Sequence, residues 1–375
     1  MNNRQRTLET KIFGCPDRIP LSPGSGRELT MNRWWSEGLP KDVGPLKYAY
    51  RQAGGVLEFN NPNPVSLLIN YKMIPQFEEK IIEKKERSQI VQDWKGNICE
   101  ISNEFTVKHL REAVGLVTRR WLKCPVENRE DWKAMMKRYD SNATERLPEN
   151  LQDLVEPLKN RTNYLQPYFN GPYWQLREWM GFEGLSMMFY DDPVLVKDMI
   201  AFWEDYVLRL MERLFEVVIP DGIEINEDMA YKQMSMLSPD MVREFLLPTW
   251  KRWGNAIRKA GVPIYNVDSD GYVGELIPLW IEAGINCNGP MEVAAGNDIV
   301  KFRKEFGKEM AYTGGVDKRL IAKGGIHIEQ EIERLRPVIE GGGFIPGCDH
   351  AIPHDVSLNN YVYYVKLLAK ETGWL

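Results

Sequence analysis

The second half of the chain alternates between short apolar runs and longer amphipathic ones. Residues 191–215 show the amphipathic pattern, and they open with two aspartates and a proline, a typical helix start. Apolar side chains then recur every three or four residues, at Met199, Trp203, Tyr206, Leu210 and Leu214. This spacing places them on one face of a helix, so we expect a long helix whose apolar face packs on the core.

Five short apolar runs are bounded by turn residues and are predicted to be buried strands. They are residues 222–228 (GIEINED), 262–268 (VPIYNVD), 284–290 (GINCNGP), 309–315 (EMAYTGG) and 343–347 (GFIPG). Helical patterns follow them at residues 238–261, 274–284, 298–307, 328–342 and 355–373. The first of these helices begins at Ser238 and Pro239, ends at Gly261, and is expected to kink near Pro248.

The first half of the chain carries weaker patterns. Strands are predicted at residues 18–24, 65–70 and 164–171. Residues 1–13 are predicted to be a helix, and the lysine-rich residues 79–87 to be the solvated face of another. Residues 141–163 are polar and are expected to be an irregular surface excursion. At the other end of the chain, either Asp355 or Ser357 is expected to cap the closing helix.

Strands that alternate with helices, with no G-x-G-x-x-G turn among them, favour a parallel barrel over a doubly wound sheet. The length of 375 residues is normal for one barrel, and a hydrophobic fraction of 43% can build a large core. We therefore expect an α/β fold, a single (β/α)8 TIM-type barrel over residues 1–375 with an N-terminal helical extension.

Charge and composition argue against several classes of partner. The net charge is −5 and no long basic run is present, which argues against nucleic acid. The chain has no stretch of about 18 apolar residues, so no membrane span is predicted, and its first residues lack the apolar core of an export signal. The five cysteines have no framework spacing, so we expect reduced thiols and a cytoplasmic location.

The loops that follow the strands of a barrel carry its chemistry, and unusual polar residues fall at those positions. They are Arg27 and Glu28, Glu227 and Asp228, Asp268 and Asp270, Asn288, Asp317 to Arg319, and Cys348, Asp349, His350 and His354. Aspartate, glutamate, cysteine and histidine side chains that converge are what a metal site or an acid–base site requires. We therefore expect the candidate site at the carboxyl end of the barrel.

The acidic residues also have structural interpretations. Glu227 could pair with a surface lysine, and Asp228 could cap the next turn. Asp268 and Asp270 could belong to an Asx-type turn before Gly271. These alternatives stay open alongside the functional ones.

The later loops have structural interpretations too. Cys348 could be a small, buried and inert thiol. His350 and His354 could form hydrogen bonds with backbone carbonyls of a tight loop. The run Asp317-Lys318-Arg319 is expected to hold a salt bridge at the end of the barrel rather than a substrate.

Three aromatic side chains and one arginine are candidates for substrate binding. Trp34, Tyr173 and Trp174 lie in loop-like contexts and could wall an apolar pocket. Arg27 follows Gly26 and could bind a substrate carboxylate, or it could instead fix the N-terminal loop.

The chain resembles the uroporphyrinogen decarboxylase superfamily, which contains the decarboxylase and the corrinoid-dependent methyltransferases related to it. The resemblance extends from NNRQRTLETKIFGCPDRIPL near the N-terminus to the closing helix. It is strongest over INEDMAYKQMSMLSPDMVREFLLP, YTGGVDKRLIAKGG and GGGFIPGCDHAIPHDVSLNNYVYYV. It implies a TIM barrel, and relatives in this superfamily are often homodimers.

Two loops distinguish the branches of this superfamily. The decarboxylase binds the propionates of its tetrapyrrole with an Arg-Gln-Ala-Gly-Arg run, of which only the second arginine has a counterpart here, Arg27. The methyltransferases bind zinc through a His-x-Cys-Gly segment and a later cysteine, which correspond here to Asp268, Asp270 and Cys348. The chain is therefore nearer the methyltransferase-like branch, and the resemblance implies Zn²⁺ on these three residues, with both early ligand types changed.

The resemblance implies an enzyme that moves a methyl group from a small methylated substrate to a corrinoid carried by a partner protein. Zn²⁺ would act as a Lewis acid on the leaving heteroatom, and Glu227 or His350 would transfer the proton. The residues expected to bind the substrate are Arg27, Trp34, Tyr173, Trp174, Asn288 and His354.

Two other functions compete with methyl transfer. The first is a metal-independent decarboxylase of a porphyrinogen or a smaller carboxylate, in which Asp268 or Asp228 would stabilise a cation and Arg27 would hold a carboxylate. The second is a barrel that binds a small ligand without catalysis and has lost the ancestral metal.

Overall fold

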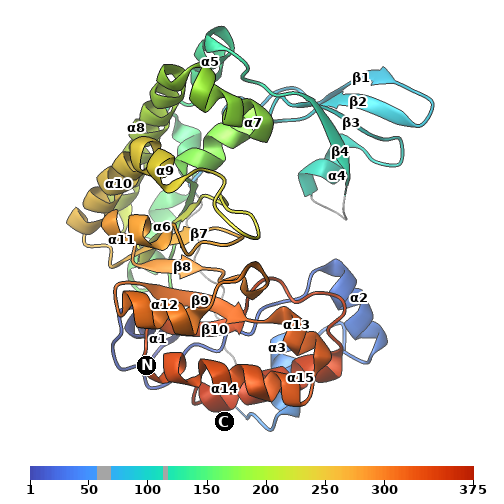
Figure 1. Ribbon diagram of the computed structural model, residues 1–375, viewed down its shortest axis with the longest axis vertical. Coiled ribbons are helices and arrows are strands. Elements are labelled where there is room, and N and C mark those ends of the chain that lie inside the picture. Colours follow the sequence, from blue (N-terminus) through green and yellow to red (C-terminus); the bar gives the residue numbers. More distant parts are fainter. Residues whose placement is uncertain (57–68, 113–116) are drawn as a thin grey trace. The chain divides into compact units, whose positions relative to one another are not determined.

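Residues 1–56, 69–112 and 117–375 are described by the computed structural model (Figure 1). They divide into two compact units. The first comprises the described parts of Met1–Leu68, Asn150–Phe169 and Phe215–Leu375, and the second those of Ile69–Glu149 and Asn170–Leu214. The expectation of a single domain over residues 1–375 stays a prediction.

The first unit is built on a six-stranded sheet with the order β10-β9-β8-β7-β6-β5. Its strands are β5 (Tyr168–Asn170), β6 (Gly222–Asn226), β7 (Ile264–Asp268), β8 (Cys287–Gly289), β9 (Ala311–Val316) and β10 (Phe344–Cys348). Neighbours from β6 to β10 pair in parallel. The five strands predicted in the second half are confirmed, and their burial along most positions is typical of parallel strands covered on both faces.

The helices of the first unit include those that the amphipathic runs of the second half predict, and further ones that were not predicted. They are α1 (Asn3–Lys11), α2 (Glu28–Ser36), α3 (Pro45–Gln52), α6 (Leu151–Lys159), α9 (Pro239–Phe245), α10 (Leu247–Lys259), α11 (Ile277–Glu282), α12 (Ile299–Phe306), α13 (Lys318–Lys323), α14 (Ile326–Glu340) and α15 (Leu358–Glu371). The run at residues 238–261 divides into α9 and α10 at Leu246, close to Pro248 as expected. Ser357 caps α15, because its hydroxyl accepts a hydrogen bond from the Asn360 amide at 3.1 Å.

The second unit combines an antiparallel sheet with helices. The sheet has the order β1 (Lys80–Lys84), β2 (Ser88–Gln92), β3 (Ile98–Ser102) and β4 (Arg119–Lys123). The helices are α4 (Val107–Glu112), α5 (Arg129–Met136), α7 (Pro172–Asp191) and most of α8 (Pro193–Val217). The long helix predicted at residues 191–215 is confirmed as α8, and its expected apolar face is buried.

The segments at residues 79–87 and 141–163 differ from expectation. Residues 79–87 contain strand β1, not a helix, although all five side chains of the strand are exposed as predicted. Its backbone pairs with β2, a contact that the composition of the segment does not reveal. Residues 141–163 are not irregular throughout, because they contain helix α6.

The described strands form part of the expected barrel and do not close it. Residues 18–24 are not a strand, although this segment lies alongside β10. The Cys348 amide donates to the Pro23 carbonyl at 3.2 Å, and Gly26 forms a parallel bridge with Ile352. Pro20 and Pro23 have no amide hydrogen, so a regular ladder cannot form here. The strand predicted at residues 65–70 falls mostly outside the described residues.

Helix α1 covers the amino ends of three strands. Leu8 on this helix, with Phe13 just beyond it, packs against Ile264, Cys287 and Ala311, which begin β7, β8 and β9. The helix predicted at residues 1–13 is thereby confirmed. In the described part of the chain, no helix is both long enough and apolar enough to cross a membrane.

Candidate functional site

One face of the parallel sheet lines a cavity of about 1050 Å³ in the first unit. Glu224 on β6 lies opposite Asn266 on β7, and Cys287 on β8 continues this row. The next row toward the carboxyl ends pairs Asp268 with Gly289. Because alternate residues of a strand point to opposite faces, Glu224, Asn266 and Asp268 all face the cavity that they line.

The cavity exists because its wall carries small side chains. Gly289 on β8, Thr313 on β9 and Gly347 on β10 line it, and two of the three have no side chain. Branched apolar side chains normally fill the interior of a (β/α)8 barrel. Small and polar residues at these inward positions leave a volume that a ligand could occupy.

Asp268 lies at the carboxyl end of β7 and lines this cavity. The pKa of its carboxyl is raised to about 7, mainly by burial. The charges of Glu224, Asp270 and Asp228 raise this pKa further, whereas His350 lowers it. Within the described ranges no hydrogen bond to this carboxyl is present. With a pKa of about 7, it is protonated in about half of the molecules at pH 7 and in most of them at lower pH.

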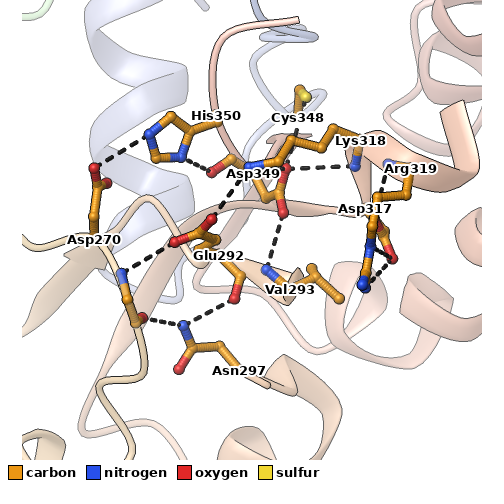
Figure 2. A network of polar contacts seen from close by, with 11 residues as sticks. Asp270, Glu292, Val293, Asn297, Asp317, Lys318, Arg319, Cys348, Asp349 and His350 are labelled. Carbon is orange, nitrogen blue, oxygen red and sulfur yellow. Dashed lines mark hydrogen bonds and ion pairs between the residues drawn. The ribbon is translucent and has the colours of Figure 1, made fainter. Parts of the chain in front are cut away.

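Asp270 pairs with His350 instead of facing Asp268 as a second free acid (Figure 2). The Oδ2 atom of Asp270 lies 3.2 Å from Nε2 of His350, and Nδ1 of His350 lies 2.9 Å from the backbone oxygen of Asp349. The hydrogen bond with Asp270 raises the pKa of His350. His350 thus makes the backbone contact expected of a structural residue and adds an ion pair to it.

Lys318 is the cation at the centre of a network that joins three loops (Figure 2). Its Nζ lies 3.3 Å from Oε1 of Glu292 and 3.9 Å from Oδ1 of Asp349. Asp349 is fully buried, and its Oδ2 accepts a hydrogen bond from the Val293 amide at 2.9 Å. The second oxygen of Glu292 accepts from the Gly271 amide at 3.1 Å. The network therefore fixes the loop that carries Asp270 beside the loop that carries His350.

The salt bridge expected for residues 317–319 is present, and it joins Asp317 and Arg319. The guanidinium Nη2 of Arg319 lies 2.8 Å from Oδ2 of Asp317. Asp317 also caps α13, because its Oδ1 accepts from the Arg319 amide at 2.9 Å. Both residues are therefore engaged with each other.

The three predicted metal ligands do not come together as a set. Asp268 and Cys348 both line the cavity, but Asp270 is paired with His350. Burial raises the pKa of the Cys348 thiol to about 12. Across the described residues, no three histidine, cysteine, aspartate or glutamate side chains are arranged to hold a metal ion. The residues present do not fit the implied zinc ion, and its binding here stays a prediction.

The loops after β6 and β7 lie together as expected. The amides of Glu227 and Asp228 both donate to the backbone oxygen of Asp268, at 2.9 and 3.3 Å. Glu227 is fully buried, and its Oε1 accepts from the indole nitrogen of Trp250 at 2.6 Å. Asp228 has a φ of 37°, which is uncommon for a residue other than glycine. The catalytic roles of these two acids stay predictions.

The three candidate aromatic residues lie on helices, so the expectation of loops is wrong for all of them. Trp34 on α2 is fully buried, donates to the Val356 carbonyl at 2.9 Å and packs on Tyr361 with ring centroids 4.5 Å apart. It does not line the cavity. Tyr173 and Trp174 begin α7 in the second unit, and their role in substrate binding stays a prediction.

The polar candidates for substrate binding have different environments. Arg27 is exposed just before α2, and among the described residues its guanidinium has no hydrogen bond or ion pair. Asn288 alternates with Gly289 and so points away from the cavity, where its amide donates to the Val267 carbonyl at 3.0 Å. His354 is exposed, and its imidazole makes no hydrogen bond or ion pair with any residue that the structure describes, so its role stays a prediction.

Two acids of this region were missed by sequence reasoning. Glu292 belongs to no recognisable motif, and only its contacts with Lys318 and Gly271 reveal it. Glu224 carried a signal, because a glutamate in the middle of the predicted buried strand GIEIN is unusual.

Comparison with known proteins identifies the family. The model of the uroporphyrinogen decarboxylase (URO-D) family matches residues 169–370. A methyltransferase from Methanosarcina mazei has a similar structure, with a TM-score of 0.59, 13% identity and 99% of each chain covered. A B12-independent methionine synthase from Shewanella sp. W3-18-1 has a TM-score of 0.38 and 13% identity, covering 79% of this chain and 74% of that one. A search of curated proteins found no match.

The similarity to the Methanosarcina methyltransferase is a similarity of fold. The family model matches more than half of the chain, including every strand from β6 to β10 and the whole acidic end of the sheet. The chain therefore belongs to the uroporphyrinogen decarboxylase (URO-D) family.

Proposed function

We propose that this chain transfers a methyl group from a small methylated substrate to a corrinoid carried by a partner protein, with Asp268 as the acid. The observation that carries the proposal is a carboxyl with a pKa of about 7 inside a cavity, at the strand end where barrel enzymes hold their chemistry. Membership of the URO-D family and the fold shared with a methyltransferase support it.

The acid matters because of the leaving group. When a methyl group leaves an ether or an alcohol oxygen, the C–O bond breaks and both of its electrons stay on the oxygen. Protonated Asp268 would give its proton to that oxygen, which then leaves as a neutral hydroxyl rather than as an anion. A reduced corrinoid on the partner protein would supply the nucleophile that accepts the methyl group. The positive charge of His350 favours the carboxylate that Asp268 becomes.

Metal assistance is the part of the expectation that the donor arrangement does not support. Asp270 is engaged with His350, and Cys348 is a buried thiol. We therefore derive no step through zinc, and Asp268 acts as a proton donor in this proposal rather than as a ligand.

Substrate recognition is proposed to involve Arg27. It is an exposed cation that has no partner among the described residues, and it belongs to the segment that runs beside β10. A guanidinium can hold a carboxylate through two parallel hydrogen bonds. A methylated substrate with a carboxylate would fit the guanidinium of Arg27.

The homodimer that the resemblance implies stays a prediction.

A decarboxylase is the second candidate, and the family match is the observation that favours it. The same acid would then protonate the carbon from which carbon dioxide departs. Arg27 is the one arginine that corresponds to the arginine run of the decarboxylase, and one arginine is a poor match for a substrate with many carboxylates. A small carboxylate would therefore be the substrate.

The test is a methyl-transfer assay with cob(I)alamin as the acceptor and methanol, 2-methoxyphenol and 2-methoxybenzoate as donors, followed by absorbance of the methylated product. We expect Asp268→Asn to lower kcat/KM by about a hundredfold or more, because an amide cannot donate the proton. Activity of the wild type should fall as the pH rises through about 7, since the protonated carboxyl is then lost.

Asp240→Asn is the matched control, because Asp240 is exposed on α9 and does not line the cavity. It should behave as the wild type. Methyl transfer at an unchanged rate by Asp268→Asn would show that Asp268 is not the acid. Release of carbon dioxide from 2-methoxybenzoate without methyl transfer would favour the decarboxylase.

A further inference from the structure

A second group of polar residues lines the cavity on the side of Asp268 that lies toward the amino ends of the strands. Tyr164 and Gln166 precede β5, Glu224 lies on β6, Asn266 on β7 and Lys11 on α1, and all five line the cavity. The Oε2 atom of Glu224 accepts from the Asn266 amide at 2.5 Å and also from the Gln166 amide. These five residues are the inner cluster.

The inner cluster is close to electrically neutral. Lys11 is only 7% exposed, donates to Oε1 of Gln166 at 3.2 Å, and has its Nζ 4.7 Å from the centroid of the Tyr164 ring. Burial raises the pKa of Glu224, and the charge of Lys11 opposes that shift. One buried cation therefore offsets one buried acid, so a further ion of either sign gains little here.

Three polar atoms of the inner cluster lack partners among the described residues. The hydroxyl of Tyr164 and Oδ1 of Asn266 are buried and make no hydrogen bond. Asn266 as a whole is 4% exposed. The Oε1 atom of Glu224 also accepts no hydrogen bond from the described residues, since both amide contacts end on Oε2. Buried polar groups are nearly always satisfied, so these atoms call for a partner.

We propose that the inner cluster is a binding subsite for a neutral group that both donates and accepts hydrogen bonds, a primary carboxamide. Its NH2 would donate to Oδ1 of Asn266 and Oε1 of Glu224, and its carbonyl would accept from the Tyr164 hydroxyl. The subsite shares the cavity with Asp268 but does not depend on methyl transfer, because it recognises a group remote from the reacting atom.

Three probes of nearly equal shape test the charge that the subsite accepts. Benzamide, benzoate and benzylamine are titrated against the whole chain, and binding is followed by saturation-transfer NMR. We expect benzamide to bind at least about tenfold more tightly than the anion or the cation, because the cluster already balances its own charges. This comparison uses the wild type and needs no variant to fold.

Tyr164→Phe tests the hydroxyl directly. Loss of one hydrogen bond should weaken benzamide binding about three- to tenfold. Tyr364→Phe is the matched control, because the buried hydroxyl of Tyr364 also has no partner among the described residues, but this side chain does not line the cavity. It should leave the affinity for benzamide unchanged, and thermal unfolding of both variants checks that they are folded.

Some results would overturn the subsite. They are equal binding of the three probes, no binding of benzamide, or an unchanged affinity in Tyr164→Phe, and each would mean that water alone satisfies the cluster. Asp268→Asn should still bind benzamide, because the acid lies in the row beyond Asn266. If Asp268→Asn still binds benzamide and also transfers methyl groups at the normal rate, the proposed function is wrong and the subsite is supported.

Discussion

Asp268 and Asp270 are separated by one residue, yet the fold gives them different environments. Asp268 ends β7, lines the cavity and has its pKa raised to about 7. Asp270 lies in the following loop, is nearly half exposed at 45% of its side chain, and pairs with His350. In the proposed function Asp268 is the proton donor, whereas Asp270 is held in an ion pair with His350. The difference between the two acids depends on burial and not on residue type.

The raised pKa of Asp268 predicts a pH-dependent effect on stability. The unfolded carboxyl has its ordinary pKa of 3.8, so between 3.8 and about 7 the folded state holds a proton that the unfolded chain has released. The free energy of unfolding therefore falls as the pH rises through this window. Asparagine cannot ionise, so Asp268→Asn should stabilise the protein by about 1–3 kcal/mol at pH 8 and by less at pH 5.

Denaturant titrations of both proteins at the two pH values measure this difference. Asp240→Asn, at an exposed position outside the cavity, again serves as the control. An equal effect of Asp268→Asn at both pH values would show that the carboxyl titrates normally.

At the scale of elements, hydrogen bonds fix the loop after β6 to strand β7 and to helix α10. Its backbone amides donate to the end of β7, and Glu227 accepts from Trp250 on α10. The broken helix that the sequence predicts near Pro248 matters here, because α10 begins at Leu247 and so sets the position of Trp250. The acidic loop beside Asp268 is held by this helix.

Trp250→Phe tests that contact. It removes a hydrogen bond to a fully buried carboxylate and should lower the free energy of unfolding by about 1–3 kcal/mol beyond the loss of ring area. Trp280→Phe is the matched control, because Trp280 is equally buried but its indole nitrogen has no partner among the described residues. Chemical denaturation of the two variants measures the difference, and equal losses would contradict the role of the hydrogen bond.

Elements of the second half were predictable because each has a strong pattern of its own. Buried parallel strands are continuous apolar runs, and amphipathic helices repeat every three or four residues. Strand β1 was not, because it is exposed and charged, and it is a strand only because β2 pairs with it. The sequence left Asp355 and Ser357 as candidates for the cap of α15. Only the hydrogen bond from the Asn360 amide to the Ser357 hydroxyl decided between them.

At the scale of the whole molecule, the expected metal site would require the ends of two strands to present three donors at one point. Asp268 ends β7, Asp270 lies in the loop after it, and Cys348 ends β10. The ion pair of Asp270 and the network around Lys318 already engage the charged groups between these loops. Convergence at the carboxyl end of the sheet is therefore not sufficient to make a metal site.

Plasma mass spectrometry of the purified protein, after zinc is supplied and excess removed, tests this conclusion. We expect less than one zinc ion per chain, with no further loss in Cys348→Ala, because no three donors are arranged around one point among the described residues. Asp240→Asn serves as the surface control. Near-stoichiometric zinc in the wild type that disappears in Cys348→Ala would mean that the metal assembles its own site.

The sequence by itself determined the alternation of strands and helices, the acidic ends of β6 and β7, and the family, because local patterns and ordered motifs carry those properties. Only the tertiary structure decided that Asp268 rather than Asp270 has a raised pKa, and that Lys318 is the cation beside Glu292 and Asp349. It also decided that polar side chains of the strands face a cavity. These features depend on burial and on contacts between residues far apart in the chain, such as Lys11 with Gln166 and Asp270 with His350, which no local pattern encodes.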